Sequence, residues 1–271
     1  MEVGTRVGPY LLEEPLGEGA MGMVFRARRE PEGEVVALKI LRRELASDEV
    51  FKKRFAHEAR AAGEVKNRHL VGILDAGEAD GSPFLAIEYV EGQTLESRLQ
   101  ASGPLELNEV ARIVTEVGSG LDALHRHELV HRDIKSANVM LKEDDTAMLT
   151  DFGLAKGRAY TVLTRAGQVM GTLDYMAPEL VKGERATGAS DIYALGCLAY
   201  ECVTGAVPFA EKSIFQIGTA HLTEEPPDPS LARPDIPAPF AWALLQALAK
   251  EPAERPQTAT LYGRMLKMAA A

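Results

Sequence analysis

Hydrophobic residues follow two different periods along this chain, and the change between them divides the sequence into two regions. In about the first 90 residues, short apolar runs are separated by Gly and Pro, which predicts strands, most clearly at 35–41 and 84–90. The stretch from about 50 to 65 has the period of a helix instead. Its apolar face consists of Phe51, Phe55, Ala59 and Ala62. The first region is therefore predicted to be β-rich with one helix.

The pattern changes after Gly92, where helical periodicity dominates. The predicted helices are 109–127, 190–203 and 240–250. Two short strands, 139–141 and 147–149, flank a turn rich in acidic residues. Six prolines between 226 and 239 argue against a helix or a central strand there. The sequence therefore predicts an α+β, two-lobed architecture, with a β-rich lobe at about 10–90, a hinge at about 88–92 and a helical lobe at about 93–267. A cleft between two lobes is a common ligand site.

Composition and charge narrow the class of protein. The chain has 271 residues, 46% hydrophobic and 26% charged, which is ordinary for a globular protein. Forty acidic and 30 basic residues give a net charge of −10, which argues against nucleic acid as a partner. Cys197 and Cys202 share one apolar stretch and are expected to be reduced core residues. With no signal peptide and no long apolar run, we expect a cytoplasmic protein, or the cytoplasmic part of a longer one that a further segment anchors.

A glycine-rich segment in the first region has the pattern G-x-G-x-x-G-x-V, with glycines at Gly17, Gly19 and Gly22. Glycine lets backbone N–H groups approach phosphate oxygens closely, because no Cβ intervenes. Taken alone, glycines in an ordinary hairpin turn explain the pattern equally well. A dinucleotide-binding unit would continue as a helix, whereas residues 23–27 continue as a strand. The pattern therefore favours a hairpin that covers phosphates.

Lys39 lies inside an apolar strand, on the same face as Val35 and Ala37. A buried ammonium is costly unless it is paired, and the alternative is a lysine on an edge strand that reaches solvent. Glu58 is the natural partner, since it lies on the apolar face of its helix, three residues after Phe55. The pair would hold the ammonium in place for phosphate contact, although a buried pair can also be purely structural.

The polar segment 131–138, with the sequence HRDIKSAN, lies between two apolar segments, and the triplet DFG follows at 151–153. Mg²⁺ prefers oxygen ligands, which Asn138 and Asp151 supply. Asp133 is placed to orient a hydroxyl and accept its proton, and Lys135 to neutralise charge on a phosphoryl group. Any one of these acids could instead cap a turn. Together they indicate phosphoryl transfer.

At this point the motif set resembles the eukaryotic-type protein kinase family, and most of all the bacterial serine/threonine kinases. The resemblance extends from about Tyr10 to about Leu266 and includes the triplet Ala177-Pro178-Glu179. It implies a bilobal kinase fold over 10–267, ATP and Mg²⁺ (or Mn²⁺) as cofactors, and protein substrates. The ATP-site residues that it implies are Leu16, Gly17, Gly19, Gly22, Val24, Ala37, Lys39, Ile87, Glu88, Val90 and Met140.

The same resemblance assigns the other roles. Asp133 is the catalytic base, with Lys135, Lys39 and Glu58 also in the catalytic set, and Asn138 and Asp151 hold the metal. The structural residues that it implies are Arg132, Glu179, Asp191 and Arg255, with Glu179 and Arg255 as a buried ion pair. One departure is Ser136-Ala137, where many members have Pro-Glu, and this puts details of peptide recognition in doubt.

Regulation is expected in the segment from Asp151 to Glu179, which is long for a loop. We expect activating autophosphorylation at Thr164, with Thr161 as a second candidate, because a phosphate there would give Arg132 a bidentate partner. Thr172 is expected to hydrogen-bond Asp133 and Lys135 rather than to accept phosphate. An ordinary loop threonine is the alternative for Thr164.

Two other functions compete with an active signalling kinase. A catalytically weak pseudokinase scaffold typically lacks the strand Lys or one of the catalytic acids, whereas Lys39, Asp133 and Asp151 are all present. A small-molecule kinase on a related fold lacks the Ala-Pro-Glu segment. Homodimerisation through the small lobe is an option that the resemblance leaves open.

Overall fold

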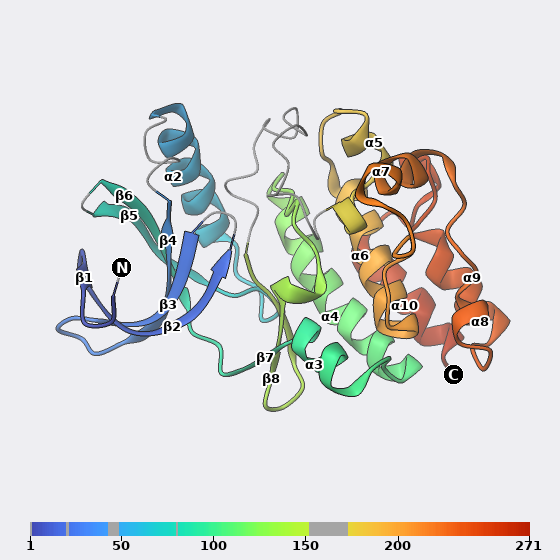
Figure 1. The fold of residues 1–271 in the computed structure, drawn as a ribbon, viewed down its shortest axis with the longest axis horizontal. Coiled ribbons are helices and arrows are strands. Elements are labelled where there is room, and N and C mark those ends of the chain that lie inside the picture. The colour runs from blue at the N-terminus through green and yellow to red at the C-terminus, as the bar shows by residue number, and fades with distance from the viewer. Residues whose placement is uncertain (1, 20–21, 43–48, 80, 152–172) are drawn as a thin grey trace. The chain divides into compact units, whose positions relative to one another are not determined.

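The structure is a computed structural model that describes residues 2–19, 22–42, 49–79, 81–151 and 173–271. The chain forms two compact units. The first comprises residues 1–66 and 71–91, and the second comprises residues 67–70 and 92–271. The long strands lie in the first unit and most of the helices in the second (Figure 1). Each unit buries apolar residues of its own.

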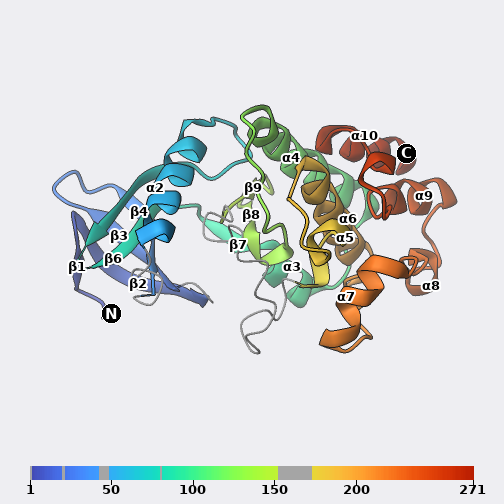
Figure 2. The same cartoon turned by 90° about the horizontal axis from the view of Figure 1, so that it is seen from above.

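In its described residues, the first unit is an antiparallel sheet with one helix. Its strands are β1 (Arg6–Val7), β2 (Tyr10–Gly19), β3 (Gly22–Arg29), β4 (Val35–Leu41), β5 (Ile73–Ala79) and β6 (Ser82–Glu88), and its helix is α2 (Glu49–Glu64). The sheet order is β1-β2-β3-β4-β6-β5, so β4 is a central strand. Helix α2 packs against the edge strand β5 (Figure 2).

Alternation of side chains along β4 places the core on one face of this sheet. Val36, Leu38 and Ile40 are buried in a cluster with Phe25 and Phe84. The intervening residues of β4 therefore point to the opposite face. Each Å² of apolar surface buried in this cluster stabilises the fold by about 25 cal/mol. A shift of the strand register by one residue would expose these side chains, so their burial fixes the register.

The second unit is mainly helical. Its elements are β7 (Gly92–Thr94), α3 (Leu95–Ser102), α4 (Leu107–Arg126), η1 (Ser136–Asn138), β8 (Val139–Lys142), β9 (Ala147–Leu149), η3 (Leu173–Tyr175), α5 (Pro178–Val181), α6 (Gly188–Thr204), α7 (Ile214–Thr223), α8 (Pro229–Ala232), α9 (Ala238–Gln246), η4 (Pro252–Glu254) and α10 (Ala259–Ala269). Helix α6 is the most buried of them, and Cys197 and Cys202 within it are free and fully buried.

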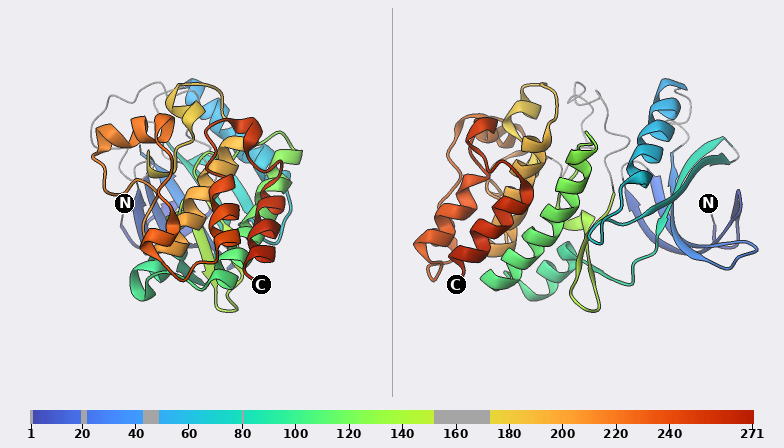
Figure 3. Two further views of the ribbon diagram at one scale, coloured as in Figure 1. Left: turned by 90° about the vertical axis from the view of Figure 1, so that its right-hand side faces the viewer. Right: turned by 180° about the vertical axis from the view of Figure 1, so that it is seen from behind.

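Helices α4 and α10 lie side by side (Figure 3). Gly263 permits this contact, because a Cβ there would lie 2.6 Å from the Cα of Thr115 on α4. Asp122 of α4 accepts hydrogen bonds from the N–H groups of Ala259 and Thr260, at 2.9 and 3.0 Å, and so caps the first turn of α10. These contacts fix α10 against α4.

Most predicted elements are confirmed. The strands at 35–41, 139–142 and 147–149 and the helices at 49–64, 107–126 and 188–204 match the sequence pattern within about two residues. The prediction that residues 226–239 contain no helix is wrong, since α8 occupies 229–232. Pro229 is its first residue, where a missing N–H costs nothing, and Asp228 caps it through the N–H of Ser230.

Among the helices of the described residues, none is both long enough and apolar enough to cross a bilayer.

Candidate active site

The first unit gathers several of the predicted ATP-site residues on one face of its sheet. Val24 is paired with Lys39, and Ala37 is paired with Ile87. All four alternate with members of the apolar cluster and therefore lie on the opposite face. Because β4 is central, the alternative of an edge-strand lysine does not apply to Lys39.

Glu58 lies on the buried face of α2, as its spacing predicts. Phe51, Phe55, Ala59 and Ala62 are all buried, and Glu58 follows Phe55 by one turn. Both residues lie in the first unit. Lys39 is on the central strand β4, and Glu58 is on α2, the one helix among the described residues of this unit.

The glycine-rich segment forms the ends of two paired strands, with Gly17 opposite Val24 and Gly19 opposite Gly22. At Gly22 a Cβ would overlap the carbonyl oxygen of Ile40, so the sheet itself requires glycine. At Gly17 and Gly19, by contrast, a Cβ would meet no atom within 4 Å among the described residues. Packing therefore does not explain these two glycines, which is what a segment that approaches a ligand would show.

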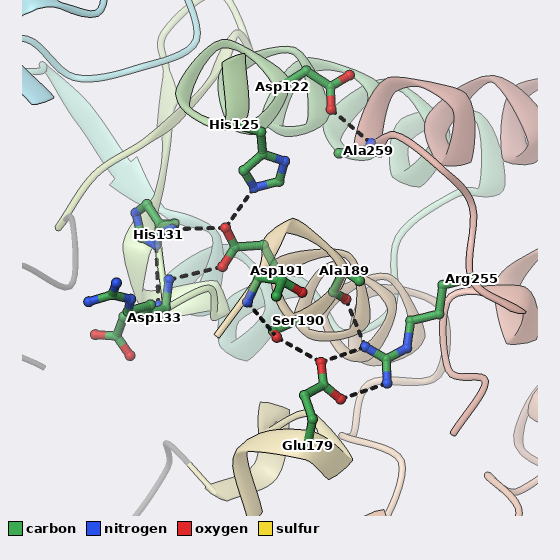
Figure 4. A network of polar contacts seen from close by, with 12 residues as sticks. Asp122, His125, His131, Asp133, Glu179, Ala189, Ser190, Asp191, Arg255 and Ala259 are labelled. Carbon is green, nitrogen blue, oxygen red and sulfur yellow. Dashed lines mark hydrogen bonds and ion pairs between the residues drawn. The ribbon is translucent and has the colours of Figure 1, made fainter. Parts of the chain in front are cut away.

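In the second unit, Asp191 of α6 holds the start of the segment 131–138. Its carboxylate accepts the backbone N–H of His131 at 2.8 Å and that of Arg132 at 2.9 Å (Figure 4). His125, at the end of α4, lies 2.8 Å from the same carboxylate through Nε2. Asp191 is 1% exposed, so its charge is compensated by these donors rather than by water.

Two residues of the site have left-handed backbone conformations that only glycine adopts freely. Arg132 has a φ of 65° and Asp151 a φ of 59°. For Arg132 this conformation costs about 1–2 kcal/mol. The hydrogen bond from its N–H to the Asp191 carboxylate contributes about 1.5–3 kcal/mol and offsets that cost. Such outliers concentrate at functional sites, where surrounding contacts impose them.

The residues expected to do chemistry in this unit lie close together. Lys135 Nζ is 3.8 Å from Asp133 Oδ2. Asn138 Nδ2 donates to the carbonyl oxygen of Asp133 at 2.7 Å. A backbone hydrogen bond links the next strand to this segment, because the N–H of Thr150 donates to the carbonyl of Asn138 at 2.9 Å. Asp151 directly follows Thr150 in the chain. The structure therefore brings Asp133, Lys135, Asn138 and Asp151 into one neighbourhood.

The ring of His131 supports this segment from inside. It is buried, and burial lowers the pKa of its imidazole below the ordinary value. Nδ1 accepts the N–H of Asp133 at 3.3 Å, so the ring proton is on Nε2, which donates to the carbonyl of Thr150 at 3.1 Å. The neutral ring thus links the Asp133 backbone to the residue before Asp151.

Glu179 and Arg255 form the buried ion pair that the resemblance implies. The guanidinium contacts both carboxylate oxygens at 2.8 Å, and Ser190 donates to the same carboxylate at 2.7 Å (Figure 4). Burial would raise the pKa of Glu179, but the hydrogen bonds from Arg255 and Ser190 outweigh it and hold the pKa below its ordinary value. Arg255 also donates to the carbonyls of Ala189, Ala249 and Lys250.

The predicted phosphorylation sites, Thr164 and Thr161, lie outside the described residues, as do Thr172 and the Phe152-Gly153 pair. Met140 is on β8, in the second unit, while the other predicted ATP-site residues are in the first.

Sequence reasoning did not single out His125. Its role depends on Gly188 at the start of α6, where a Cβ would lie 2.9 Å from His125 Nδ1. His125 and Gly188 are far apart in the chain, and no sequence pattern links a histidine in the last turn of one helix to a glycine at the start of another. Only the packing of α4 on α6 shows that the glycine makes room for the ring.

A second buried histidine makes the stability of this unit dependent on pH. His221 on α7 packs against Tyr193 and Phe209 and shares a 2.8 Å hydrogen bond with the Tyr193 hydroxyl. Burial, and then the charge of Lys250, lowers the pKa of His221 from 6.5 to about 4. The folded state therefore keeps this ring neutral at pH values where the unfolded chain protonates it.

The expected consequence is a loss of stability in acid. Above pH 6.5 neither state is protonated at His221, and between pH 6.5 and about 4 only the unfolded state is. The unfolding free energy should therefore fall by about 3 kcal/mol across this window from this residue alone. Urea titrations at several pH values measure it. His221→Gln should flatten the slope, whereas exposed His127→Gln should leave it unchanged, and equal slopes in all three proteins would contradict the assignment.

The fold and the site define the class of protein. A small antiparallel sheet with one helix, together with a helical unit that holds an HRD segment through a buried acid, is the bilobal protein kinase fold, as predicted. The protein kinase domain family matches residues 10–264, and the chain belongs to that family.

The relatives that match are bacterial kinases. The chain is 41% identical over 253 residues to serine/threonine-protein kinase PknH of Mycobacterium bovis, covering 93% of this chain and 42% of that protein. It is 43% identical over 264 residues to serine/threonine-protein kinase pkn3 of Myxococcus xanthus, covering 93% and 48%. A crystal structure of the Mycobacterium tuberculosis PknI kinase domain superimposes with a TM-score of 0.81 at 30% identity, over 99% of both chains. The chain thus spans less than half the length of these full-length relatives.

Proposed function

We propose that this chain is the catalytic domain of a serine/threonine protein kinase, over residues 10–267 with a hinge at about 88–92, that transfers the γ-phosphate of ATP to protein hydroxyls. The observation that supports this most directly is the tightly held segment 131–138, which brings Asp133, Lys135 and Asn138 together. Relatives named serine/threonine-protein kinases at about 40% identity support the choice of acceptor.

The first unit carries the residues proposed to contact the phosphates of the nucleotide. Gly17, Gly19 and Gly22 would cover the phosphates, and Lys39, paired with Glu58, would contact the α- and β-phosphates. The adenine would lie against apolar side chains, with backbone groups of the hinge bonded to its edge. The residues proposed for this pocket are Leu16, Val24, Ala37, Ile87, Glu88, Val90 and Met140.

The protein kinase family uses ATP with a divalent metal ion. The donor set of this chain fits Mg²⁺, with Mn²⁺ as a substitute. The amide nitrogen of Asn138 donates to Asp133, so its oxygen is the atom left to face a cation, and Asp151 adds a carboxylate. Bound there, the metal would neutralise charge on the phosphates.

Asp133 would orient the substrate hydroxyl and accept its proton. As the hydroxyl oxygen forms its bond to the γ-phosphorus, the bond from that phosphorus to the β–γ bridging oxygen breaks and ADP leaves. Lys135, 3.8 Å from Asp133, would neutralise charge on the transferring phosphoryl group. Arg132 would bind a phosphate on Thr164 or Thr161 and so link autophosphorylation to activity.

Two alternatives predict different results. A pseudokinase scaffold would bind without transferring phosphate, and a small-molecule kinase would not phosphorylate protein. The Ala177-Pro178-Glu179 segment, held by Arg255 through Glu179, favours a protein substrate. The domain would work in the cytoplasm, where ATP is available and its two free cysteines stay reduced. Homodimerisation through the first unit is a further option.

The direct test is incubation with radiolabelled ATP, Mg²⁺ and a basic protein substrate, followed by phosphoamino-acid analysis and mass spectrometry. We expect phosphoserine and phosphothreonine on the substrate and phosphate on Thr164 of the kinase. Lys39→Met is the matched control and should lose both signals. No transfer to protein, even with Mn²⁺, would favour the scaffold, and an unmodified Thr164 in a fully active preparation would end the regulatory proposal.

A further inference from the structure

One carboxylate of the first unit contacts two arginines of the neighbouring strand. Glu13, on β2, accepts hydrogen bonds from Arg26 Nη1 and from Arg28 Nε on β3, the latter at 2.6 Å. The side chains of Glu13 and Arg26 are only 22% and 27% exposed. Because water screens a partly buried pair less than an exposed one, we expect this contact to be stronger than an ion pair on an open surface.

A β-bulge sets the position of Glu13. In the pairing of β2 with β3, Leu12 is opposite Ala27 and Glu14 is opposite Arg26, so Glu13 is an extra residue on its strand. A bulge bends the strand and changes the direction of a side chain, and bulges are frequent next to active sites. The strand pairing itself thus places the Glu13 carboxylate against β3.

Arg26 lies on the face of the sheet that carries Lys39. Its neighbours Phe25 and Ala27 are buried in the apolar cluster, so alternation puts Arg26 on the opposite face, together with Val24. Across the strand pair it is opposite Ala37. Since Val24 and Ala37 are both proposed to contact the adenine, Arg26 lies beside the proposed adenine pocket.

The Arg26 guanidinium also contacts the ring of Tyr89. Its Cζ atom lies over the ring, 5.7 Å from the centroid, a distance at which a cation is attracted by the electron-rich face of an aromatic ring. Strand β6 ends at Glu88, one residue before Tyr89. The Tyr89 side chain therefore connects to the sheet a part of the backbone that lies beyond the strand. This part belongs to the hinge, whose backbone groups are proposed to bind the adenine edge.

We propose that Arg26 is a positioning residue for nucleotide binding, which is held by Glu13 and acts through the ring of Tyr89 to fix residues 88–90 for the adenine edge. This inference rests on the proposed kinase function. Because these side chains act on the adenine end of the site and not on the transferred phosphate, their loss should weaken ATP binding without slowing phosphoryl transfer.

The test compares Arg26→Met with the wild-type chain. Methionine keeps much of the length of arginine but carries no charge, so it removes both the ion pair with Glu13 and the attraction to the Tyr89 ring. A cation–π contact is worth a factor of about 2 to 30 in an equilibrium constant, and we expect Kd and KM for ATP with Mg²⁺ to rise about fivefold while kcat stays the same. Calorimetric titration and steady-state kinetics measure these values. An unchanged KM, or a kcat that falls as far as KM rises, would overturn the positioning role.

Arg28→Met is the matched control. Arg28 is on the same strand and the same face, contacts the same carboxylate, and also donates to the carbonyl of Gly33 at 3.1 Å. The guanidinium that lies over the Tyr89 ring, however, is that of Arg26. Arg28→Met should therefore leave KM for ATP at the wild-type value. Equal increases in both methionine variants would show that lost positive charge weakens ATP binding, and this would overturn the inference.

Variants of Tyr89 test the ring. Tyr89→Phe keeps the aromatic face and should behave like the wild-type chain, whereas Tyr89→Leu should raise KM about as much as Arg26→Met. The double variant Arg26→Met/Tyr89→Leu should bind ATP no more weakly than either single variant, because both changes break the same contact. Losses that multiply in the double variant would contradict this contact.

Glu13→Gln tests the carboxylate that holds Arg26. Glutamine keeps an acceptor oxygen but no charge, and a hydrogen bond without the charge is about half as strong. We therefore expect KM for ATP to rise by about twofold, between the wild-type value and that of Arg26→Met. A KM at the wild-type value would contradict the role of Glu13 in the proposal.

Hydrogen–deuterium exchange and ATP binding distinguish failure of this inference from failure of the proposed function. Without nucleotide, Arg26→Met should speed amide exchange at residues 88–90, and this result depends on no catalytic step. If the wild-type chain binds ATP but transfers no phosphate, the kinase proposal fails, and the Kd values of the variants still decide the role of Arg26. Unchanged exchange at residues 88–90 would overturn the inference even in an active kinase.

Discussion

Replacing Asp133 by asparagine is expected to reduce kcat by about 100- to 10,000-fold while the protein stays folded. The amide has nearly the same shape as the carboxylate, but it accepts no proton from the attacking hydroxyl. The backbone N–H of Asp133 donates to the His131 ring, and its carbonyl accepts from the side-chain amide of Asn138, so neither contact depends on the carboxylate. Steady-state kinetics with saturating ATP measure the loss, and the melting temperature checks the fold.

Asp145→Asn is a suitable control for that experiment. Asp145 lies in the turn between β8 and β9, with a left-handed φ of 61° that asparagine also tolerates. This change removes a carboxylate from the same unit and should leave kcat unaltered. Wild-type turnover in Asp133→Asn would show that the base has been misassigned.

Replacing Arg255 by methionine is expected to lower the unfolding free energy of the second unit by about 3–5 kcal/mol. The side chain of Arg255 is fully buried and that of Glu179 is 6% exposed, so the change leaves a carboxylate without its partner and without water. It also leaves the carbonyls of Ala189, Ala249 and Lys250 without a donor. Urea or thermal unfolding measures the loss.

An exposed ion pair of the same unit provides the contrast. Lys212 and Glu224 are 2.8 Å apart, with side chains 31% and 46% exposed. Because water screens such a pair, Lys212→Met should cost less than about 1 kcal/mol. Similar losses in both methionine variants would mean that burial does not decide the strength of the Glu179–Arg255 pair.

Local periodicity predicted the strands and helices wherever burial follows a simple repeat. The strand 35–41 and the helix from about 50 could be read from sequence because Val36, Leu38, Phe51 and Phe55 are all buried at the expected spacing. The same spacing put Lys39 and Glu58 at their places on these elements. It failed at α8, where a cap and a first-turn proline outweigh the number of prolines nearby.

The site itself was accessible to sequence only where its residues are close in the chain. The segment 131–138 stands out because polar groups interrupt apolar strands, and a family resemblance then assigned roles to its members. The partners that hold it did not stand out as a group. Asp191 binds backbone groups 60 and 59 residues away, and the hydroxyl of Ser136 reaches Glu201 across 65 residues.

By itself, then, the sequence determined which residues alternate, which are buried and which chemistry is present, since these follow from local spacing and side-chain type. Only the tertiary structure decided that one buried helix supplies the acids on both sides of the catalytic segment. It also decided that Gly188 makes room for His125 and that two hydroxyls share the carboxylate of Glu201. The physical reason is that these contacts depend on how α4, α6 and the short helical turns pack in three dimensions. The spacing of hydrophobic residues along the chain does not contain this information.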